Sequence, residues 1–76
     1  MNEAYVLLNI DYKSKKEIIE KVKKIPVTKA VKTVYGIYDI LVILESDDMQ
    51  KIKQAIDEYL HNLDGIKNIT SLISVN

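Results

Sequence analysis

Two stretches of the chain are apolar at almost every position. Residues 4–10 are apolar except for Asn9, and residues 40–44 read Ile-Leu-Val-Ile-Leu. Short runs of this kind are typical of buried strands. Residues 29–35 and 66–75 are rich in β-branched residues and predict two further strands. The pattern therefore predicts four strands, the third covering residues 38–44.

Two other stretches have helical periodicity. Ser14 and Glu17 have the spacing of a capping box, in which each side chain accepts a hydrogen bond from a free N–H at the helix start. Pro26 is expected to end this first helix, because the residue before a proline avoids helical geometry. Ser46 is the expected N-cap of a second helix, and Gly65 follows its end. The apolar positions of the two helices are Ile18, Ile19, Val22 and Ile25 in the first, and Met49, Ile52, Ile56, Tyr59, Leu60 and Leu63 in the second.

The predicted elements follow one another in the order β-α-β-β-α-β. This order is typical of the ferredoxin-like α+β fold, an antiparallel sheet with two helices on one face. The length of 76 residues allows one domain, so residues 1–76 are assigned to it as a whole. The first and third strands form the central pair in this topology.

The central strands carry more apolar residues than one covered face needs. An antiparallel sheet with helices on one side should alternate apolar and polar residues, but 5–8 and 40–44 are apolar throughout. A large apolar patch rarely faces water in a monomer. We expect a second copy to cover this face, giving a sheet-on-sheet dimer of the α/β-barrel type. Coverage by terminal residues or tyrosine rings of the same chain is the alternative.

The segment Tyr35-Gly36-Ile37-Tyr38-Asp39 joins the second and third strands and is the most distinctive part of the sequence. Gly36 allows a positive φ angle, and Asp is common in turns. A tight two-residue turn with Gly first would connect the strands. Residue chemistry alone indicates only a hairpin here.

Charge and composition exclude several classes of protein. Lys+Arg and Asp+Glu both number 11, every basic residue is Lys, and there is no Cys. A nucleic-acid-binding protein usually carries a basic excess, so no direct nucleic-acid partner is expected. One His and no Cys offer no closed metal site, and no metal or other cofactor is expected. Neither a membrane span nor a signal peptide is recognised, which favours a cytoplasmic protein.

Catalytic residues are equally scarce. His61 is the only side chain that titrates near neutral pH, and its place late in the second helix favours a surface position. No nucleophile and base can be paired without Cys or a second His. We therefore expect a protein that is not an enzyme.

The hairpin segment resembles the signature of a known family. Val34–Asp39 leading into Ile40–Val42 is similar to the C-terminal effector domain, or RAM domain, of the Lrp/AsnC transcription regulators. Asn62–Ile66 and the pair Thr70-Ser71 fit this resemblance, which covers essentially the whole chain. The chain resembles the stand-alone version, which lacks the N-terminal DNA-binding domain.

This resemblance implies how the domain works. Such domains dimerise through their sheets, assemble into octamers or decamers, and bind a free amino acid at the contacts between dimers. The carboxylate of the ligand would meet backbone N–H groups near Gly36, and the ammonium would meet Asp39. The implied ligand-binding residues are Tyr35, Gly36, Ile37, Tyr38, Asp39, Thr70 and Ser71.

Two functions remain open on the sequence. The first is an amino-acid effector-binding and oligomerisation module that modulates full-length Lrp/AsnC regulators. The alternative is a small dimeric α/β-barrel enzyme, which would need a titratable residue facing a cavity between sheet and helices. The position of any cavity discriminates between them.

Overall fold

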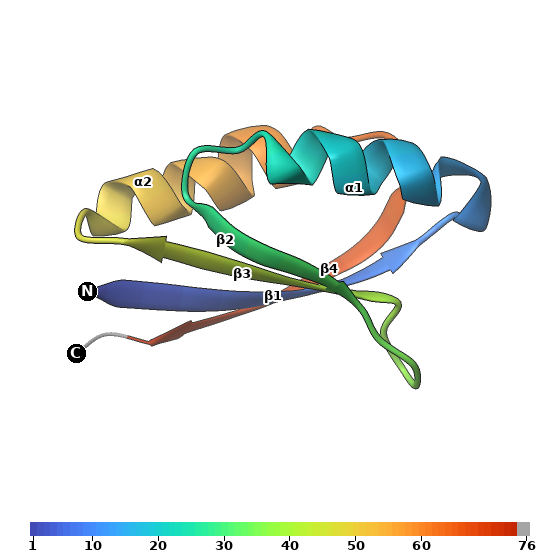
Figure 1. The fold of residues 1–76 in the computed structure, drawn as a ribbon, viewed down its shortest axis with the longest axis horizontal. Coiled ribbons are helices and arrows are strands. Elements are labelled where there is room, and N and C mark those ends of the chain that lie inside the picture. Colours follow the sequence, from blue (N-terminus) through green and yellow to red (C-terminus); the bar gives the residue numbers. More distant parts are fainter. Residues whose placement is uncertain (75–76) are drawn as a thin grey trace.

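The computed structural model describes residues 1–74 and contains the predicted elements in the predicted order (Figure 1). The C-terminal strand is described as far as Ser74, and Val75, which the sequence assigned to it, lies outside the described residues. The elements are β1 (Asn2–Ile10), η1 (Tyr12–Ser14), α1 (Lys15–Lys23), β2 (Thr28–Thr33), β3 (Ile40–Ser46), α2 (Met49–Gln54), η2 (Ala55–Leu60) and β4 (Ile66–Ser74).

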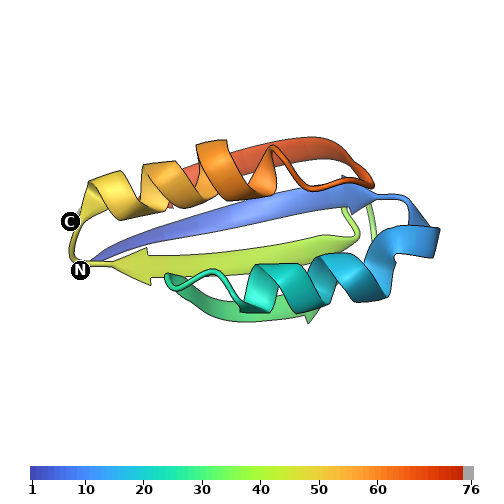
Figure 2. The same cartoon turned by 90° about the horizontal axis from the view of Figure 1, so that it is seen from above.

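The four strands form one antiparallel sheet in the order β2-β3-β1-β4. Both helices lie on the same face, with α1 over the β2–β3 side and α2 over the β1–β4 side (Figure 2). The ferredoxin-like α+β fold is thus confirmed, and β1 and β3 are its central pair. No helix within residues 1–74 is long and apolar enough to cross a membrane.

The hydrophobic core lies between the sheet and the helices. Alternate residues of the central strands point into it, because successive side chains of a strand point to opposite faces. Val6 and Val42 face each other across the β1–β3 pair, and both are fully buried. The buried apolar residues are Ala4, Val6, Leu8, Ile10, Ile18, Val22, Ile25, Ile40, Val42, Leu44, Ile52, Ala55, Ile56 and Leu60.

The start of α1 differs from the prediction. Asp11 accepts a hydrogen bond from the Lys13 N–H at 3.2 Å and begins a 3₁₀ turn, which runs directly into α1. Ser14 makes no side-chain cap hydrogen bond, so the predicted capping box with Glu17 is wrong. Glu17 instead pairs with Lys21 one turn later, which lowers the pKa of the Glu17 carboxyl.

The second helix also begins later than predicted. Asp48, rather than Ser46, caps α2 by accepting from the Gln50 N–H at 2.9 Å. Ser46 ends β3, and its hydroxyl accepts from the Asp48 N–H. Beyond Gln54 the helix continues as the π-helical segment η2, and Ala55, which the predicted apolar stripe omitted, is buried beside Ile52 and Ile56. Tyr59, which the stripe included, is 47% exposed.

Gly65 holds the start of β4 against the start of α1. Its φ angle is +92°, a conformation that side-chain-bearing residues rarely adopt. A Cβ atom at this position would lie 2.5 Å from the Ser14 Cβ. The Gly65 carbonyl also accepts from the Asp11 N–H at 2.7 Å. Ser14 is thus a packing neighbour of this glycine.

Replacing Gly65 with Ala should lower the free energy of unfolding by about 2–4 kcal/mol, from backbone strain together with the clash against Ser14. Gly36→Ala is the matched control, because its φ is also positive, at +131°, but nothing lies within 4 Å of an added Cβ. That variant should lose only about 1 kcal/mol. Urea unfolding followed by circular dichroism measures both. Equal losses would show that the contact with Ser14 contributes nothing.

Candidate ligand-binding loop and open sheet face

The connection between β2 and β3 is a six-residue loop, residues 34–39, rather than the predicted two-residue turn. The last cross-strand pair is Thr33 with Ile40. The Val34 N–H donates to the Asp39 carbonyl at 3.0 Å and closes the base of this hairpin loop. With six residues instead of two, the loop extends away from the sheet on the side opposite the helices (Figure 1).

Asp39 ties the loop to the end of β1. Its backbone N–H donates to the Leu8 carbonyl at 2.9 Å, directly beyond the last β1–β3 pair, Leu8 with Ile40. Its carboxylate Oδ2 accepts from the Ile10 N–H at 3.0 Å, and Oδ1 accepts from the Tyr12 hydroxyl at 3.4 Å. The Ile10 bond occurs where the β1–β4 register shifts between Asn9 and Ile10. One carboxylate oxygen is therefore used structurally, and the other is only weakly engaged.

Two further hydrogen bonds hold the loop against the sheet. The Asn9 side-chain amide donates to the Ile37 carbonyl at 2.6 Å. The Tyr38 hydroxyl lies 3.1 Å from Thr70 Oγ1, and either group can donate. The loop thus reaches from β3 across β1 to the far edge strand, β4. The sequence did not predict Asn9 or Tyr12 as part of this site, although Asn9 is the one polar residue within the apolar run 4–10.

The tip of the loop is exposed. Tyr35 is 96% exposed and Ile37 is 85% exposed. Within residues 1–74, the backbone N–H groups of residues 35–38 have no hydrogen-bond partner. Successive free N–H groups in a turn form a partial positive charge that attracts anions. The loop therefore offers unpaired backbone donors directly before Asp39 in the sequence.

Thr70 and Ser71 lie on opposite faces of the sheet. Thr70 pairs with Leu7 on the face that the loop covers, whereas Ser71 pairs with the buried Val6 on the helix side. The structure therefore brings Tyr35, Gly36, Ile37, Tyr38, Asp39 and Thr70 together. Ser71 lies apart from them.

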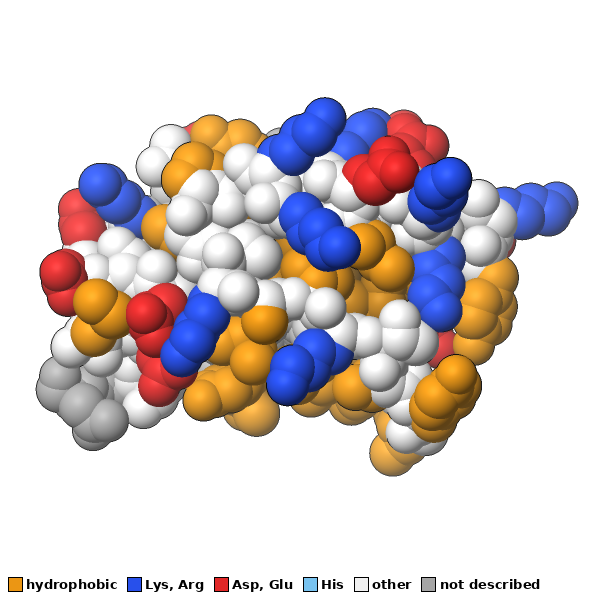
Figure 3. All heavy atoms as spheres, in the orientation of Figure 1, with side chains coloured by type: hydrophobic (Ala, Val, Ile, Leu, Met, Phe, Trp, Pro, Cys, Tyr) orange, Lys and Arg blue, Asp and Glu red, His pale blue; other side chains and the backbone are white. Residues whose placement is uncertain are grey.

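The face of the sheet away from the helices, called the open face here, is apolar at its centre. Tyr5 is 37% exposed and Leu72 is 58% exposed, while Leu7, Leu41 and Ile43 are half-buried. Apolar side chains emerge along the lower edge of the molecule in the view of Figure 3, below the sheet. This centre continues towards the hairpin loop, so the loop and the open face form one surface.

A charged cluster lies at the opposite end of the open face. Lys29 Nζ lies 3.1 Å from Glu45 Oε2 and 3.8 Å from Glu3 Oε2. The hydrogen bond that Lys29 donates to the Glu45 carboxylate raises the pKa of Lys29 above its usual value. The two carboxylates and the one ammonium carry a net charge of −1 and are partly exposed, so they form a polar rim.

Other candidate chemistry is sparse in the described part of the chain. The His61 side chain is exposed at the end of η2, and its backbone N–H donates to the Ile56 carbonyl. No three His, Cys, Asp or Glu side chains among residues 1–74 are placed to hold a metal ion. The hairpin loop, with its adjoining open face, is therefore the candidate functional site.

A family model described as the Lrp/AsnC ligand binding domain matches residues 3–76. No curated protein matches the chain. Among solved structures, the chain is similar to a protein named FFRP-DM1, with 28% identity and a TM-score of 0.89, covering 99% of this chain and 100% of that one. A hypothetical protein, PHS023 from Pyrococcus horikoshii, is also 28% identical, with a TM-score of 0.90 and coverage of 100% and 92%.

A third similar structure is longer. The transcriptional regulator NMB0573 from Neisseria meningitidis, solved as a complex with L-Met, is 17% identical with a TM-score of 0.85. The match covers 99% of this chain but only 50% of that regulator. The likeness to this regulator shows a shared fold.

Asp39→Ala should destabilise the protein by about 1–3 kcal/mol, because the Ile10 N–H loses its acceptor in a partly buried position. Asp39→Asn is the matched control, since its amide oxygen still accepts from that N–H, and it should stay within about 0.5 kcal/mol of the parent. Chemical unfolding of the three proteins measures the difference. Similar losses in both variants would mean that the charge, rather than the acceptor, stabilises the loop.

Proposed function

Because the chain belongs to the Lrp/AsnC ligand-binding domain family, we propose that it is an amino-acid effector-binding and oligomerisation module. The observation that carries the proposal is the row of unpaired N–H groups at residues 35–38 beside the Asp39 carboxylate. The L-Met complex of the Neisseria meningitidis regulator supports an amino acid as the ligand. The module would modulate full-length regulators by assembling with them or by competing for amino acid.

A free amino acid matches the charges of the loop. Its carboxylate would accept hydrogen bonds from the N–H groups near Gly36 and Ile37, which suits a chain with no Arg. Its ammonium would meet the Asp39 Oδ1, the less engaged carboxylate oxygen. Tyr35 and Tyr38 would border the side chain of the ligand. Thr70 supports Tyr38 through the hydrogen bond at 3.1 Å.

The same surface accounts for assembly. A second copy would cover the apolar centre of the open face, and the dimer would be built sheet on sheet. Tyr35 and Ile37, nearly fully exposed at the loop tip, would then be covered where dimers meet in an octamer or decamer. An amino acid bound at the loop would be enclosed by that second contact. Ligand and assembly would therefore favour each other.

The dimeric α/β-barrel enzyme is not proposed. Such an enzyme needs a titratable side chain in a cavity between the sheet and the helices. Within residues 1–74, every buried side chain in that layer is apolar. Asp39 lies at the loop, outside the layer, and His61 is exposed.

A thermal-shift screen of the twenty amino acids should identify at least one that stabilises the protein, by about 2.7 kcal/mol at 100 times its dissociation constant. For that amino acid, Asp39→Asn should weaken binding by roughly 1.5–3 kcal/mol in calorimetry, because the ammonium loses its charged partner. Asp57→Asn, the same change on an exposed helix residue, should bind as the parent does.

Two results would count against this site. Equal affinity in the parent and Asp39→Asn would exclude Asp39 as the partner of the ammonium. Failure of all twenty amino acids to bind would leave only the assembly role.

Leu41→Asp should give a folded monomer, because Leu41 lies on the open face and the charge would prevent a second sheet from covering it. Its neighbour Val42 is fully buried on the helix side, so Val42→Asp should unfold the chain. Light scattering at micromolar concentration reports the mass, and circular dichroism reports folding. A parent protein that is already monomeric would refute the sheet-on-sheet dimer.

A further inference from the structure

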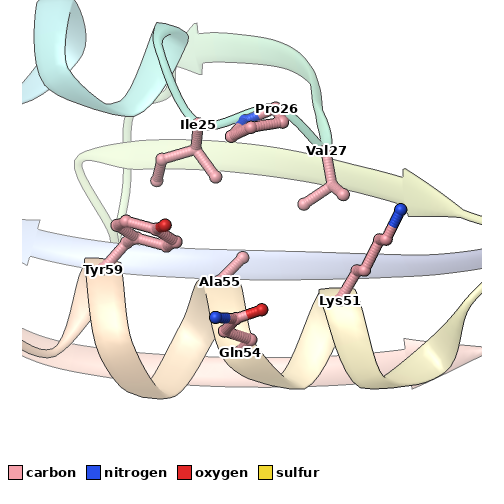
Figure 4. A pocket seen from close by; sticks show the side chains of 7 residues that line it. All are labelled: Ile25, Pro26, Val27, Lys51, Gln54, Ala55 and Tyr59. Carbon is pink, nitrogen blue, oxygen red and sulfur yellow. The ribbon is translucent and has the colours of Figure 1, made fainter.

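A groove beside the second helix lies on the helix side of the sheet, whereas the hairpin loop lies on the other side. It has a volume of about 220 Å³ and runs between the α1–β2 connection and the second helix. Figure 4 shows Tyr59 next to Ile25 at one end and Lys51 next to Val27 at the other, with Ala55 between them. The lining residues are Ile25, Pro26, Val27, Lys51, Gln54, Ala55 and Tyr59.

The second helix shapes the groove through residue spacing. Lys51, Ala55 and Tyr59 are four residues apart and share the helix face that points towards Ile25 and Val27. Ala55 is only 1% exposed and has the smallest side chain of the three, so it leaves a notch between the longer ones. The notch at Ala55 therefore separates the Lys51 and Tyr59 side chains, one on either side of it.

The chemistry of the groove is apolar with one charged end. Ile25, 6% exposed, and Ala55 belong to the hydrophobic core and form an apolar floor. Within the described residues, the Lys51 ammonium has no ion-pair partner and the Tyr59 hydroxyl has no hydrogen-bond partner. No Asp or Glu is among the lining residues.

We propose that this groove binds small aliphatic monocarboxylates that lack an amino group, such as the 2-oxo acids that correspond to branched-chain amino acids. The carboxylate would pair with Lys51, the aliphatic body would cover Ala55, and the branched apolar end would lie against Tyr59. A free amino acid fits less well, because its ammonium would find no carboxylate and would lie near a lysine of the same charge.

This site goes beyond the proposed function and does not depend on it. The hairpin loop offers the Asp39 carboxylate to an ammonium, whereas the groove offers only a cation. The sheet and the core separate the two sites (Figure 1). One chain could therefore bind an amino acid on one layer and its deaminated counterpart on the other.

The test uses ligands with one carbon skeleton. 4-Methylpentanoate, 4-methyl-2-oxopentanoate, leucine and 4-methylpentylamine are titrated into ¹⁵N-labelled protein and followed by amide chemical shifts. The two carboxylates without an amine should shift the amides of Ile25, Val27 and Ala55 saturably. Leucine and the amine should leave these three amides unchanged, whatever leucine does at the hairpin loop.

Lys51→Gln should weaken binding of 4-methyl-2-oxopentanoate about tenfold, because a charge-assisted contact is lost. Lys53→Gln is the matched control, since Lys53 belongs to the same helix but lies outside the groove. Both lysines are exposed, so both variants should keep the fold, which the same spectra verify.

Three outcomes would overturn the proposal. They are the absence of saturable shifts at the groove, shifts of equal size with the amine, and equal weakening in the two lysine variants. Shifts at the groove without any amino-acid binding at the loop would support the groove site while counting against the proposed function.

Discussion

β1 and β3 pair along seven residues, from Asn2 opposite Ser46 to Leu8 opposite Ile40, and both strands are apolar on both of their faces. On one face the pairing brings Val6 against Val42 and builds the core beneath the helices. The same pairing necessarily places Leu7 against Leu41 on the other face, since side chains alternate along a strand. A shift of the pairing by one residue would exchange the side chains on the core face with those on the open face. The core and the uncovered apolar surface are therefore placed by the same strand pairing.

The end of this pairing also determines where the hairpin loop lies. β1 pairs with β3 only as far as Leu8, opposite Ile40, so the Ile10 N–H lies beyond the end of this ladder and is satisfied by the Asp39 carboxylate instead. Asp39 supplies the acceptor, and the Asn9 side chain holds the loop carbonyl at Ile37. The hairpin loop between β2 and β3 thus supplies hydrogen-bond partners for the end of β1. These hydrogen bonds leave the loop's backbone N–H groups at residues 35–38 without partners in the described chain.

The sequence was sufficient for the fold because strand and helix periodicity depend on many residues at once. It failed at single residues, where two local choices have similar energies. Asp11 and Ser14 are both good cap residues, but Asp11 makes the cap hydrogen bond, whereas Ser14 packs against Gly65, which lies 51 residues further along the chain. The length of the loop could not be predicted from the sequence either, because the six-residue connection depends on the hydrogen bonds of Asp39 to Leu8 and Ile10 of β1. The opposite orientations of Thr70 and Ser71 follow from strand alternation, which the sequence contained but motif matching ignored.

The two candidate sites differ in the sign of one fixed charge. Both offer donors to a carboxylate, the backbone N–H groups at the loop and the Lys51 ammonium at the groove. Only the loop adds a carboxylate of its own, Asp39, beside those donors. A ligand with an amine gains a partner at the loop and meets repulsion at the groove, whereas a ligand without one leaves Asp39 unpaired but loses nothing at the groove. Amino acids and their 2-oxo acids have identical side chains and differ only at C2, so this charge is the feature of the two sites that discriminates between them. A chain with no Arg and a net charge of zero would thus bind amino acids at the hairpin loop and 2-oxo acids at the groove.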